Sequence, residues 1–371
     1  METGYWEGDS GDAWQSEQLV LCHDDARGLR AAIAIDDTTL GPGLGGVRFG
    51  SYPSDAAAIV EAQRLAASMT LKNALAGLPY GGAKSVILAP SHDTDRLALM
   101  QRFGEFVRRT GGAYLPGVDM GTTPTDLQAM ADGGAEVSCN DEDPSPWTAL
   151  GVAAAARAAV AHVDGDQDLS RIRVLIQGAG HVGADLARDL AADGAQVVVS
   201  DIDKRRAAAV AAEVAGSTVS AGDVLDTPCD LFAPCSVAKV VTPATARRMQ
   251  CRMIAGAAND TLSDAGCAAL LAARGITYVP DFVANAGGVI HIHSLRAGHS
   301  QDRLRADVQA IGERSREILA VAADTGRTPL EVATERVRSI LDGARGASDG
   351  ARSSGAARRS ETHERALQHA A

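Results

Sequence analysis

The sequence predicts an α/β protein built from two domains. The chain has 371 residues, a length that favours two domains over one. Residues 146–342 alternate short apolar strands with helices, a pattern typical of a parallel sheet with right-handed crossovers. Residues 17–145 instead mix short strands and helices without that regular alternation.

The first half begins with a predicted β-hairpin, in which residues 18–22 and 29–35 are strands joined by a turn at 24–28. A glycine-dense loop at 41–48 leads into a short strand. Ser54 has the position of an N-cap, and the helix after it should end before Gly77. The remaining expected elements are a strand at 84–88, a helix at 93–110, a strand at 113–115, a loop at 116–123 and a short helix from Pro124.

The second half follows a hinge predicted at residues 141–146. Its expected strands are 173–177, 196–200, 231–233, 253–255 and 278–280. Its expected helices are 147–163, 184–193, 204–215, 264–274, 301–325 and 329–341. Residues 1–16 and 343–371 lack apolar periodicity and are predicted to be disordered.

Composition excludes several classes of function. A net charge of -12 argues against nucleic-acid and anionic-membrane partners. No apolar run approaches the roughly 20 residues of a membrane helix, and residues 1–14 lack the features of a signal peptide, so we expect a cytoplasmic protein. The six cysteines form no C-x-x-C pair and are expected to be reduced. His291 and His293 lack nearby acidic or cysteine ligands, so we expect no metal site.

A glycine motif in the second half points to a dinucleotide. Gly178, Gly180 and Gly183 form a G-x-G-x-x-G pattern, with His181 and Val182 between the last two glycines. The motif follows an apolar strand and opens a helix, so the helix N-terminus can stabilise a pyrophosphate. A turn that binds nothing is the alternative.

Asp201 follows the first glycine of the motif by 23 residues. At that place a carboxylate can accept hydrogen bonds from the adenosine ribose and would repel a 2′-phosphate, so the sequence favours NAD as cofactor. Arg205 and Arg206 follow closely and leave NADP open.

Two lysines stand twelve positions apart in the segment 69–85, around a turn rich in Gly and Pro. The whole chain has only four lysines, Lys72, Lys84, Lys204 and Lys239. Unlike arginine, lysine can lose its proton when it is desolvated or lies beside another cation. Lys72 and Lys84 in one pocket therefore suggest an anion clamp and a general base, whereas two surface lysines are the alternative.

Asp119 and the glycines Gly45 and Gly46 complete this set. A site that removes hydride from a carbon bearing an amine and a carboxylate needs a cation for the carboxylate, which Lys72 can supply. It also needs a base near working pH to activate water, for which Lys84 is suited, and a group that exchanges protons with the nitrogen, which Asp119 can be. Taken alone, Asp119 in its glycine-flanked loop is more often a turn residue.

Asn259 and Asn285 each follow a predicted strand of the second half. Open α/β sheets bind ligands beyond their strand ends. These amides can bond a nicotinamide ribose or a substrate carboxylate, and a turn-forming asparagine is the alternative at each position.

The chain resembles the Glu/Leu/Phe/Val amino-acid dehydrogenases, and within them the leucine, valine and phenylalanine branch. The segments that carry the resemblance are GPGLGGVRF (41–49), MTLKNALAGLPYGGAKSVI (69–87), GVDMGTT (117–123), DPSPWTALGV (143–152), CDLFAPC (229–235), AGAAN (255–259) and PDFVANAGGVI (280–290). The resemblance implies a mixed α/β catalytic domain, here at 17–145, and a Rossmann-type NAD-binding domain, here at 146–342, with a cleft between them. It also implies a homo-oligomer and NAD-dependent oxidative deamination of an L-amino acid to a 2-oxo acid and ammonia.

Position by position, the resemblance assigns substrate-carboxylate binding to Lys72 and catalysis to Lys84 and Asp119. It places Gly45, Asn259 and Asn285 against substrate or cofactor. The positions matching the side-chain pocket are Leu44, Gly45, Met69, Gly117, Val289 and Ile292. None of them is a cation for a second carboxylate, which disfavours glutamate.

Within that pocket, Gly117 resembles the phenylalanine enzymes, whereas Leu44 and Val289 resemble the valine and leucine enzymes. Branched-chain amino acids are therefore favoured, with phenylalanine close behind. The segments 236–239 and 291–294 depart from the family pattern. They keep two alternatives open, an enzyme for an unusual amino acid or imine and a non-catalytic NAD-binding sensor.

Overall fold

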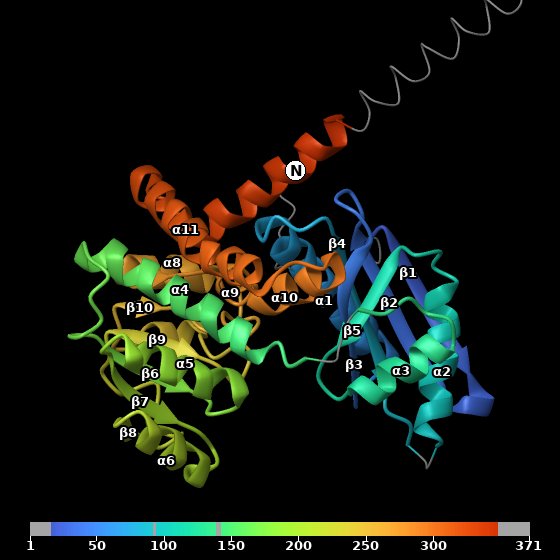
Figure 1. The fold of residues 1–371 in the computed structure, drawn as a ribbon, viewed down its shortest axis with the longest axis horizontal. Coiled ribbons are helices and arrows are strands. Elements are labelled where there is room, and N and C mark those ends of the chain that lie inside the picture. The colour runs from blue at the N-terminus through green and yellow to red at the C-terminus, as the bar shows by residue number, and fades with distance from the viewer. Residues whose placement is uncertain (1–15, 92–93, 139–141, 348–371) are drawn as a thin grey trace, which may run out of the picture.

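The computed structural model describes residues 16–91, 94–138 and 142–347, which form two α/β units side by side (Figure 1). The first unit holds a five-stranded sheet and the second a six-stranded sheet. The predicted two-domain α/β fold is confirmed. The tails predicted to be disordered fall almost entirely outside the described residues, as does part of the predicted hinge.

The first sheet has the strand order β1-β2-β4-β3-β5. Its strands are β1 (Gln18–Asp24), β2 (Leu29–Asp37), β3 (Gly43–Gly50), β4 (Gly81–Leu88) and β5 (Tyr114–Val118). The predicted hairpin is present, since β1 and β2 pair antiparallel across the short 3-10 helix Asp25–Arg27. β3 runs parallel to both β4 and β5.

Helices cover both faces of this sheet. They are α1 (Asp55–Leu75), α2 (Arg96–Arg108) and α3 (Pro124–Asp132). Side chains alternate along β2, so that Ile33 and Ile35 pack in the core with α2 and α3, whereas Ala32 and Ala34 pack with α1. Ser54 caps α1 through a hydrogen bond that its Oγ accepts from the Ala57 N–H at 3.1 Å. The helix ends before Gly77, as predicted.

Two loop predictions in this unit are wrong. The glycine-dense segment is strand from Gly43 onward, and the strand β5 reaches Val118. Glycines usually weaken strands, but here they allow close contact: a Cβ atom on Gly45 would lie 1.7 Å from the carbonyl oxygen of Ala83 on β4. The pairing of β3 with its neighbours therefore outweighs the local preference for a loop.

The second sheet is entirely parallel, with the order β11-β10-β9-β6-β7-β8. Its strands are β6 (Arg173–Gln177), β7 (Gln196–Ser200), β8 (Ser217–Thr218), β9 (Leu231–Pro234), β10 (Met253–Ile254) and β11 (Thr277–Tyr278). This is the doubly wound order of dinucleotide-binding sheets, which reverses between β6 and β9. Ligands bind beyond the carboxyl ends of the strands at such a reversal.

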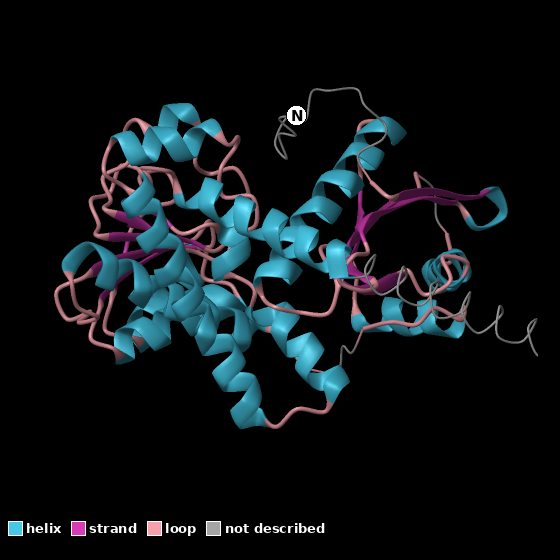
Figure 2. Ribbon diagram, turned by 90° about the horizontal axis from the view of Figure 1, so that it is seen from above, coloured by secondary structure: helices cyan, strands magenta, loops and turns pink. Residues whose placement is uncertain are grey.

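Helices surround the second sheet, as Figure 2 shows from above. They are α4 (Ser145–Asp164), α5 (His181–Ala192), α6 (Lys204–Glu213), α7 (Pro243–Ala246), α8 (Gly266–Ala273), α9 (Asp281–Ala284), α10 (Gly287–Ala297) and α11 (Gln301–Thr325), followed by a helix over residues 329–347. Within the described ranges, no helix is both long and apolar enough to cross a bilayer.

Three further predictions need correction. α5 begins at His181, inside the glycine motif, and not at the predicted residue 184. Asn285 follows the short helix α9 and not a strand. Residues 343–347 are helical, and Arg345 Nη2 lies 2.5 Å from Asp37 Oδ2 of the first unit. This contact with a distant strand end stabilises a segment without apolar periodicity.

Asp36, at the end of β2, is a carboxyl whose ionisation opposes folding. Its Oδ2 accepts a hydrogen bond from Thr70 Oγ at 2.6 Å, and burial raises the pKa of Asp36 to about 6. The unfolded value is about 3.9. Below about pH 4 the Asp36 carboxyl is protonated in both the folded and the unfolded protein. Its destabilising effect therefore develops as the pH rises from 4 to about 6. The variant Asp36→Asn is expected to raise the free energy of unfolding above pH 7 by about 1–3 kcal/mol.

Urea unfolding at several pH values tests this expectation. The gain of Asp36→Asn should vanish near pH 4, where the wild-type carboxyl is already neutral. Asp55→Asn, which alters an exposed carboxylate paired with Arg30, is the matched control. A gain that does not change with pH would contradict the assigned ionisation.

Candidate active site

Lys72 lies in the last turn of α1 and faces the second unit. Its side chain is buried, and its Nζ donates a hydrogen bond to Asn259 Oδ1 at 2.9 Å. Asn259 follows β10, at the carboxyl edge of the parallel sheet. Asn285 Nδ2 donates to the same Asn259 oxygen at 2.8 Å and to the Ala257 carbonyl at 3.1 Å. The structure thus brings three predicted site residues together between the two units.

Lys84 projects from β4, a central strand of the first sheet. Its Nζ lies 3.0 Å from Asp119 Oδ2, and Asp119 directly follows β5. The same carboxylate oxygen accepts a hydrogen bond from Arg48 Nε at 3.0 Å. All three side chains are largely shielded from solvent. The predicted pair of Lys84 and Asp119 is therefore in direct contact.

The charges of this cluster set its protonation states. Burial raises the pKa of Asp119, but the opposing charges of Lys84 and Arg48 outweigh it and bring the value down to about 2. Burial lowers the pKa of Lys72 to about 8, and the positive charge of Lys84 acts in the same direction. Asp119 is thus ionised at neutral pH, and Lys72 loses its proton more readily than an exposed lysine does.

Two glycines of β3 make room for these side chains. A Cβ atom on Gly46 would lie 2.7 Å from the Asp119 Cβ and 3.3 Å from the Lys84 Nζ. A Cβ atom on Gly45 would meet the backbone of β4 and lie 3.3 Å from the Met69 side chain. A larger residue at Gly46 would displace the lysine or the aspartate, and one at Gly45 would push β3 away from β4.

A narrow pocket runs between α1 and the loops after β10 and β11. It brings together the predicted residues Met69, Lys72, Lys84 and Asn259. Its lining also includes residues that the sequence did not single out: Arg48, Leu65, Ser68, Leu71, Asp260, Asp281 and Phe282. Of these, Asp281 accepts a hydrogen bond from the Thr261 N–H at 2.7 Å, and burial raises its pKa to about 6.

The other residues predicted for a side-chain pocket do not line this one. Leu44 is buried in a large apolar cluster, against which Val289 and Ile292 of α10 pack. Gly117 pairs with Gly46 in the register of β3 and β5. A Cβ atom on Gly117 would lie 2.8 Å from Ser138 Oγ, so a side chain there would enter occupied space.

Arg48 is the contact of Asp119 that the sequence could have revealed. It stands two residues after Gly46, and alternate residues of a strand share one face. A loop at this segment, which its glycines suggest, would have no such alternation. No sequence pattern points to Asp281, because its place in the pocket depends on how the two units pack against each other.

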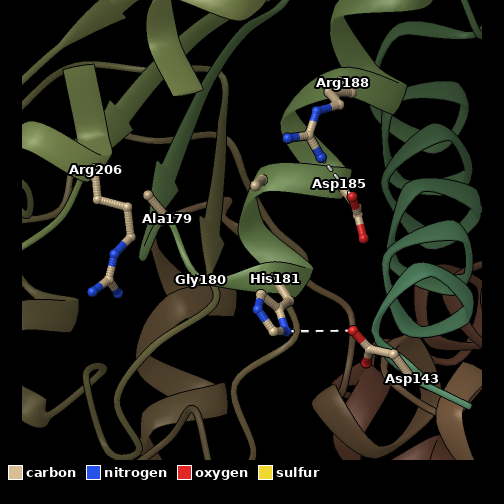
Figure 3. Close-up of a pocket in the computed structure, with 8 residues that line it drawn as sticks. Asp143, Ala179, Gly180, His181, Asp185, Arg188 and Arg206 are labelled. Atoms are coloured by element: carbon tan, nitrogen blue, oxygen red, sulfur yellow. Dashed lines mark hydrogen bonds and ion pairs between the residues drawn. The ribbon is translucent and has the colours of Figure 1, made fainter. Parts of the chain in front are cut away.

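The glycine motif forms a second cleft at the N-terminus of α5 (Figure 3). Gly178 has φ +105°, a conformation that L side chains rarely adopt, and a Cβ atom on Gly183 would lie 1.9 Å from the Gly178 carbonyl. A Cβ atom on Gly180 would meet nothing within 4 Å, so the peptide there faces open space. The cleft is lined by Asp143, Ala179, Gly180, His181, Ala184, Asp185, Arg188 and Arg206.

Of the predicted cofactor residues near the glycine motif, His181 lines this cleft, whereas Val182 is half-buried against the core. The exposed His181 Nδ1 lies 3.3 Å from Asp143 Oδ2, a contact drawn in Figure 3. Asp201 accepts hydrogen bonds from the N–H groups of Ala179 (2.7 Å) and Asp203 (2.8 Å). Its carboxylate is therefore fixed next to the glycine turn.

Two family models match the chain. The model described as "Glu/Leu/Phe/Val dehydrogenase, dimerisation domain" covers residues 17–135, and "Glutamate/Leucine/Phenylalanine/Valine dehydrogenase" covers residues 201–345. A leucine dehydrogenase of Thermoactinomyces intermedius is 35% identical over 332 residues, which is 88% of this chain and 90% of the relative. The chain belongs to the Glu/Leu/Phe/Val dehydrogenase family.

Other relatives of this family agree. A valine dehydrogenase of Streptomyces coelicolor is 37% identical over 327 residues, covering 85% of this chain and 90% of the relative. The crystal structure of L-tryptophan dehydrogenase from Nostoc punctiforme matches with a TM-score of 0.79 and 32% identity, over 89% of this chain and 97% of that one. The resemblance found in the sequence motifs is confirmed.

NAD is the cofactor of this dehydrogenase, as the leucine and valine branch of the family implies. The residues present fit it. The open side of Gly180 leaves space for a pyrophosphate against the helix N-terminus. Asp201 stands at the end of β7, where the carboxylate that binds an adenosine ribose belongs.

Proposed function

We propose that this dehydrogenase oxidatively deaminates an apolar L-amino acid to the 2-oxo acid and ammonia, and catalyses the reverse reaction. The observation that carries the proposal is the joint placement of Lys72, Lys84 and Asp119 in one shielded site next to Asn259. This site adjoins the carboxyl edge of the sheet that holds the glycine motif. A substrate bound there lies between the first unit and the cofactor.

Lys72 and the asparagines bind and orient the substrate. The Lys72 ammonium is suited to a carboxylate, and a substrate carboxylate would replace Asn259 Oδ1 as its partner. Asn259 and Asn285 are then free to bond the nicotinamide ribose or the substrate. Gly45 lets β3 lie close to β4 beneath the Met69 side chain.

Lys84 and Asp119 move protons. NAD, when bound, accepts the hydride that leaves the α-carbon, which converts the amine into an iminium group. Lys84, in its neutral form, takes a proton from the water that attacks this carbon. Asp119, which is ionised at neutral pH, accepts a proton from the substrate ammonium before the hydride leaves and returns it to the nitrogen of the carbinolamine. The C–N bond then breaks to release ammonia, the carbonyl of the 2-oxo acid forms, and the hydroxyl proton passes to solvent. One water is consumed for each ammonia released.

The side-chain pocket favours apolar amino acids. Leu44, Met69, Gly117, Val289 and Ile292 offer no cation to a second carboxylate, which disfavours glutamate. Leucine and valine dehydrogenases among the relatives support the branched-chain amino acids, with phenylalanine close behind. One methylene changes discrimination by only about 1–3 kcal/mol, so several substrates can share this pocket.

The assembly and the domain limits belong to the same proposal. We assign the catalytic domain to residues 17–145 and the NAD-binding domain to 146–342, limits supported by the start of α4 at Ser145. We also propose a homo-oligomer, which the name of the first matching family model supports.

Nicotinamide absorbance tests the reaction directly. The protein is mixed with NAD and, in turn, L-Val, L-Leu, L-Ile, L-Phe, L-Trp and L-Glu. We expect turnover with the branched-chain amino acids and L-Phe, and the slowest turnover with L-Glu. Silence across the panel, with NAD still binding in a calorimetric titration, would overturn the proposed reaction.

A further inference from the structure

Arg48 is a second cation on the carboxylate of Asp119, beside Lys84. It lies on β3, and its Nε donates a hydrogen bond to Asp119 Oδ2 at 3.0 Å. Lys84 Nζ lies 3.0 Å from the same oxygen. The side chains of Arg48, Asp119 and Lys84 are only 17%, 16% and 9% exposed. Two cations therefore share one carboxylate oxygen in a site that is largely shielded from water.

The far end of the Arg48 side chain is held by Glu61 of α1. Arg48 Nη1 donates a hydrogen bond to Glu61 Oε1 at 2.8 Å. Glu61 is itself held by Arg64, which donates to its two oxygens at 2.9 and 3.0 Å. The N–H donors of a guanidinium lie in one plane with a fixed geometry, so two acceptors set both its position and its direction. The Nε–H of Arg48 is thus aimed at Asp119.

The proposed deamination needs an unusual combination of charges in the pair of Lys84 and Asp119. Lys84 has to be neutral to take a proton from water, while Asp119, in contact with it, has to be ionised. An isolated ion pair opposes this combination, because each charge stabilises the other. A permanent cation on the carboxylate resolves the conflict, since it stabilises the anion and disfavours a proton on the lysine. Arg48 suits this task, because arginine does not deprotonate in proteins.

Two other cations lie near this pair, and neither can take the place of Arg48. Lys72 lines the same pocket, but in the proposed complex the substrate carboxylate meets its charge. Arg64 is engaged by Glu61 and by Asp260, whose Oδ2 lies 2.6 Å from the Arg64 Nη1. Only Arg48, among the described residues around the pair, therefore adds a permanent positive charge to the contact with the carboxylate.

Other titratable groups around the pair are acids and phenols. Asp260 and Asp281 line the pocket from the second unit. As anions, both favour a proton on Lys84 and so increase the need for a cation beside it. Burial raises the pKa values of Tyr52 and Tyr114, so these phenols are uncharged at neutral pH.

We propose that Arg48 is a positioning residue that lets Lys84 be neutral while Asp119 stays ionised. Its Nε–H holds the Asp119 carboxylate, and its permanent charge lies on the same carboxylate oxygen as the Lys84 amine. Glu61 fixes Arg48 in this place. This inference rests on the proposed deamination.

The variant Arg48→Gln removes the charge. Its kcat for deamination should reach half of the maximal value at a pH about one unit or more above that of the wild type, since a neighbouring unit charge shifts such equilibria by about 1–3 pH units. At pH 7 its kcat should therefore be about tenfold lower or less than that, and it should return towards the wild-type value at high pH. A merely structural role would lower kcat by the same factor at every pH.

Arg48→Lys separates the charge from the geometry. It keeps a positive charge, but an ammonium does not bridge two acceptors as a planar guanidinium does. Its kcat should fall only a few-fold, and its half-maximal pH should stay at the wild-type value. A wild-type half-maximal pH in Arg48→Gln, or one raised in Arg48→Lys, would overturn the proposed role.

Arg30→Gln is the matched control. Arg30 lies on β2 and pairs with Asp55 of α1 at the surface, so it also joins a strand of the first sheet to α1. This variant should keep the wild-type kcat and the wild-type pH profile. Circular dichroism compares the folding of all three variants.

Acetylation of the lysines separates this inference from the proposed reaction. Acetic anhydride reacts with the neutral amine and not with the ammonium, and peptide mass spectrometry then gives the acetylated fraction of Lys84 against pH, with exposed Lys204 as reference. Acetylation of Lys84 should begin at a higher pH in Arg48→Gln than in the wild type.

The two proposals then fail separately. Turnover in the wild type, together with the same acetylation curve for Lys84 in both proteins, whether rising or flat, would leave the reaction standing and overturn the role of Arg48. A shifted curve in a protein whose wild type turns over no amino acid would support the effect of Arg48 on Lys84 and overturn the reaction.

Discussion

Replacing Lys84 by alanine is expected to lower kcat for oxidative deamination by about 10²–10⁴-fold, the usual contribution of a positioned general base. The variant removes the Nζ that lies 3.0 Å from Asp119 Oδ2 and leaves Arg48 as the cation beside that carboxylate. NAD affinity should not change, because the glycine cleft belongs to the other unit. Steady-state kinetics and a calorimetric NAD titration measure the two quantities separately.

Lys84→Arg separates the charge of Lys84 from its proton transfer. Arginine keeps a positive charge against Asp119 but does not deprotonate in proteins. This variant should therefore be nearly as slow as Lys84→Ala, while its free energy of unfolding stays closer to that of the wild type. A Lys84→Arg enzyme with nearly wild-type kcat would show that Lys84 acts only through its charge.

Local patterns in the sequence were enough for much of the fold. The strands β6 and β7 have the predicted limits, because apolar runs bounded by glycine and aspartate mark buried parallel strands. The glycine turn between them was also predictable, since Gly178 and Gly183 are required by backbone conformation and close packing. The hairpin β1–β2 follows from two apolar runs and a short turn.

Features that depend on distant contacts were not predictable in this way. The segment at Gly43 and Gly45 looks like a loop, and only the approach of β4 makes it a strand. The ion pairs of Arg48 and Arg64 depend on where α1 lies against the first sheet and against the second unit. Burial at the boundary of the two units lowers the pKa of Lys72 to about 8, and no local pattern in the sequence marks that boundary.

The variant Lys72→Gln is expected to weaken binding of the 2-oxo acid by about 10²-fold, because it replaces a charge-assisted hydrogen bond in a buried site by a neutral one. kcat should fall much less, since the carboxylate is held alike in the ground state and in the transition state. The 2-oxo acid is the better ligand for this test, because it has no amine that titrates. Its dissociation constant is measured across pH for both proteins.

The pH dependence identifies the group that titrates. Lys72 binds a carboxylate only while it is protonated, and its pKa is about 8. The affinity of the wild type for the 2-oxo acid should therefore be constant below that value and fall about tenfold for each pH unit above it. Lys72→Gln should bind weakly at every pH, with a flat profile, whereas the exposed-site control Lys204→Gln should follow the wild type. A Lys72→Gln profile that still falls above pH 8 would assign the titrating cation, and with it carboxylate binding, to another residue.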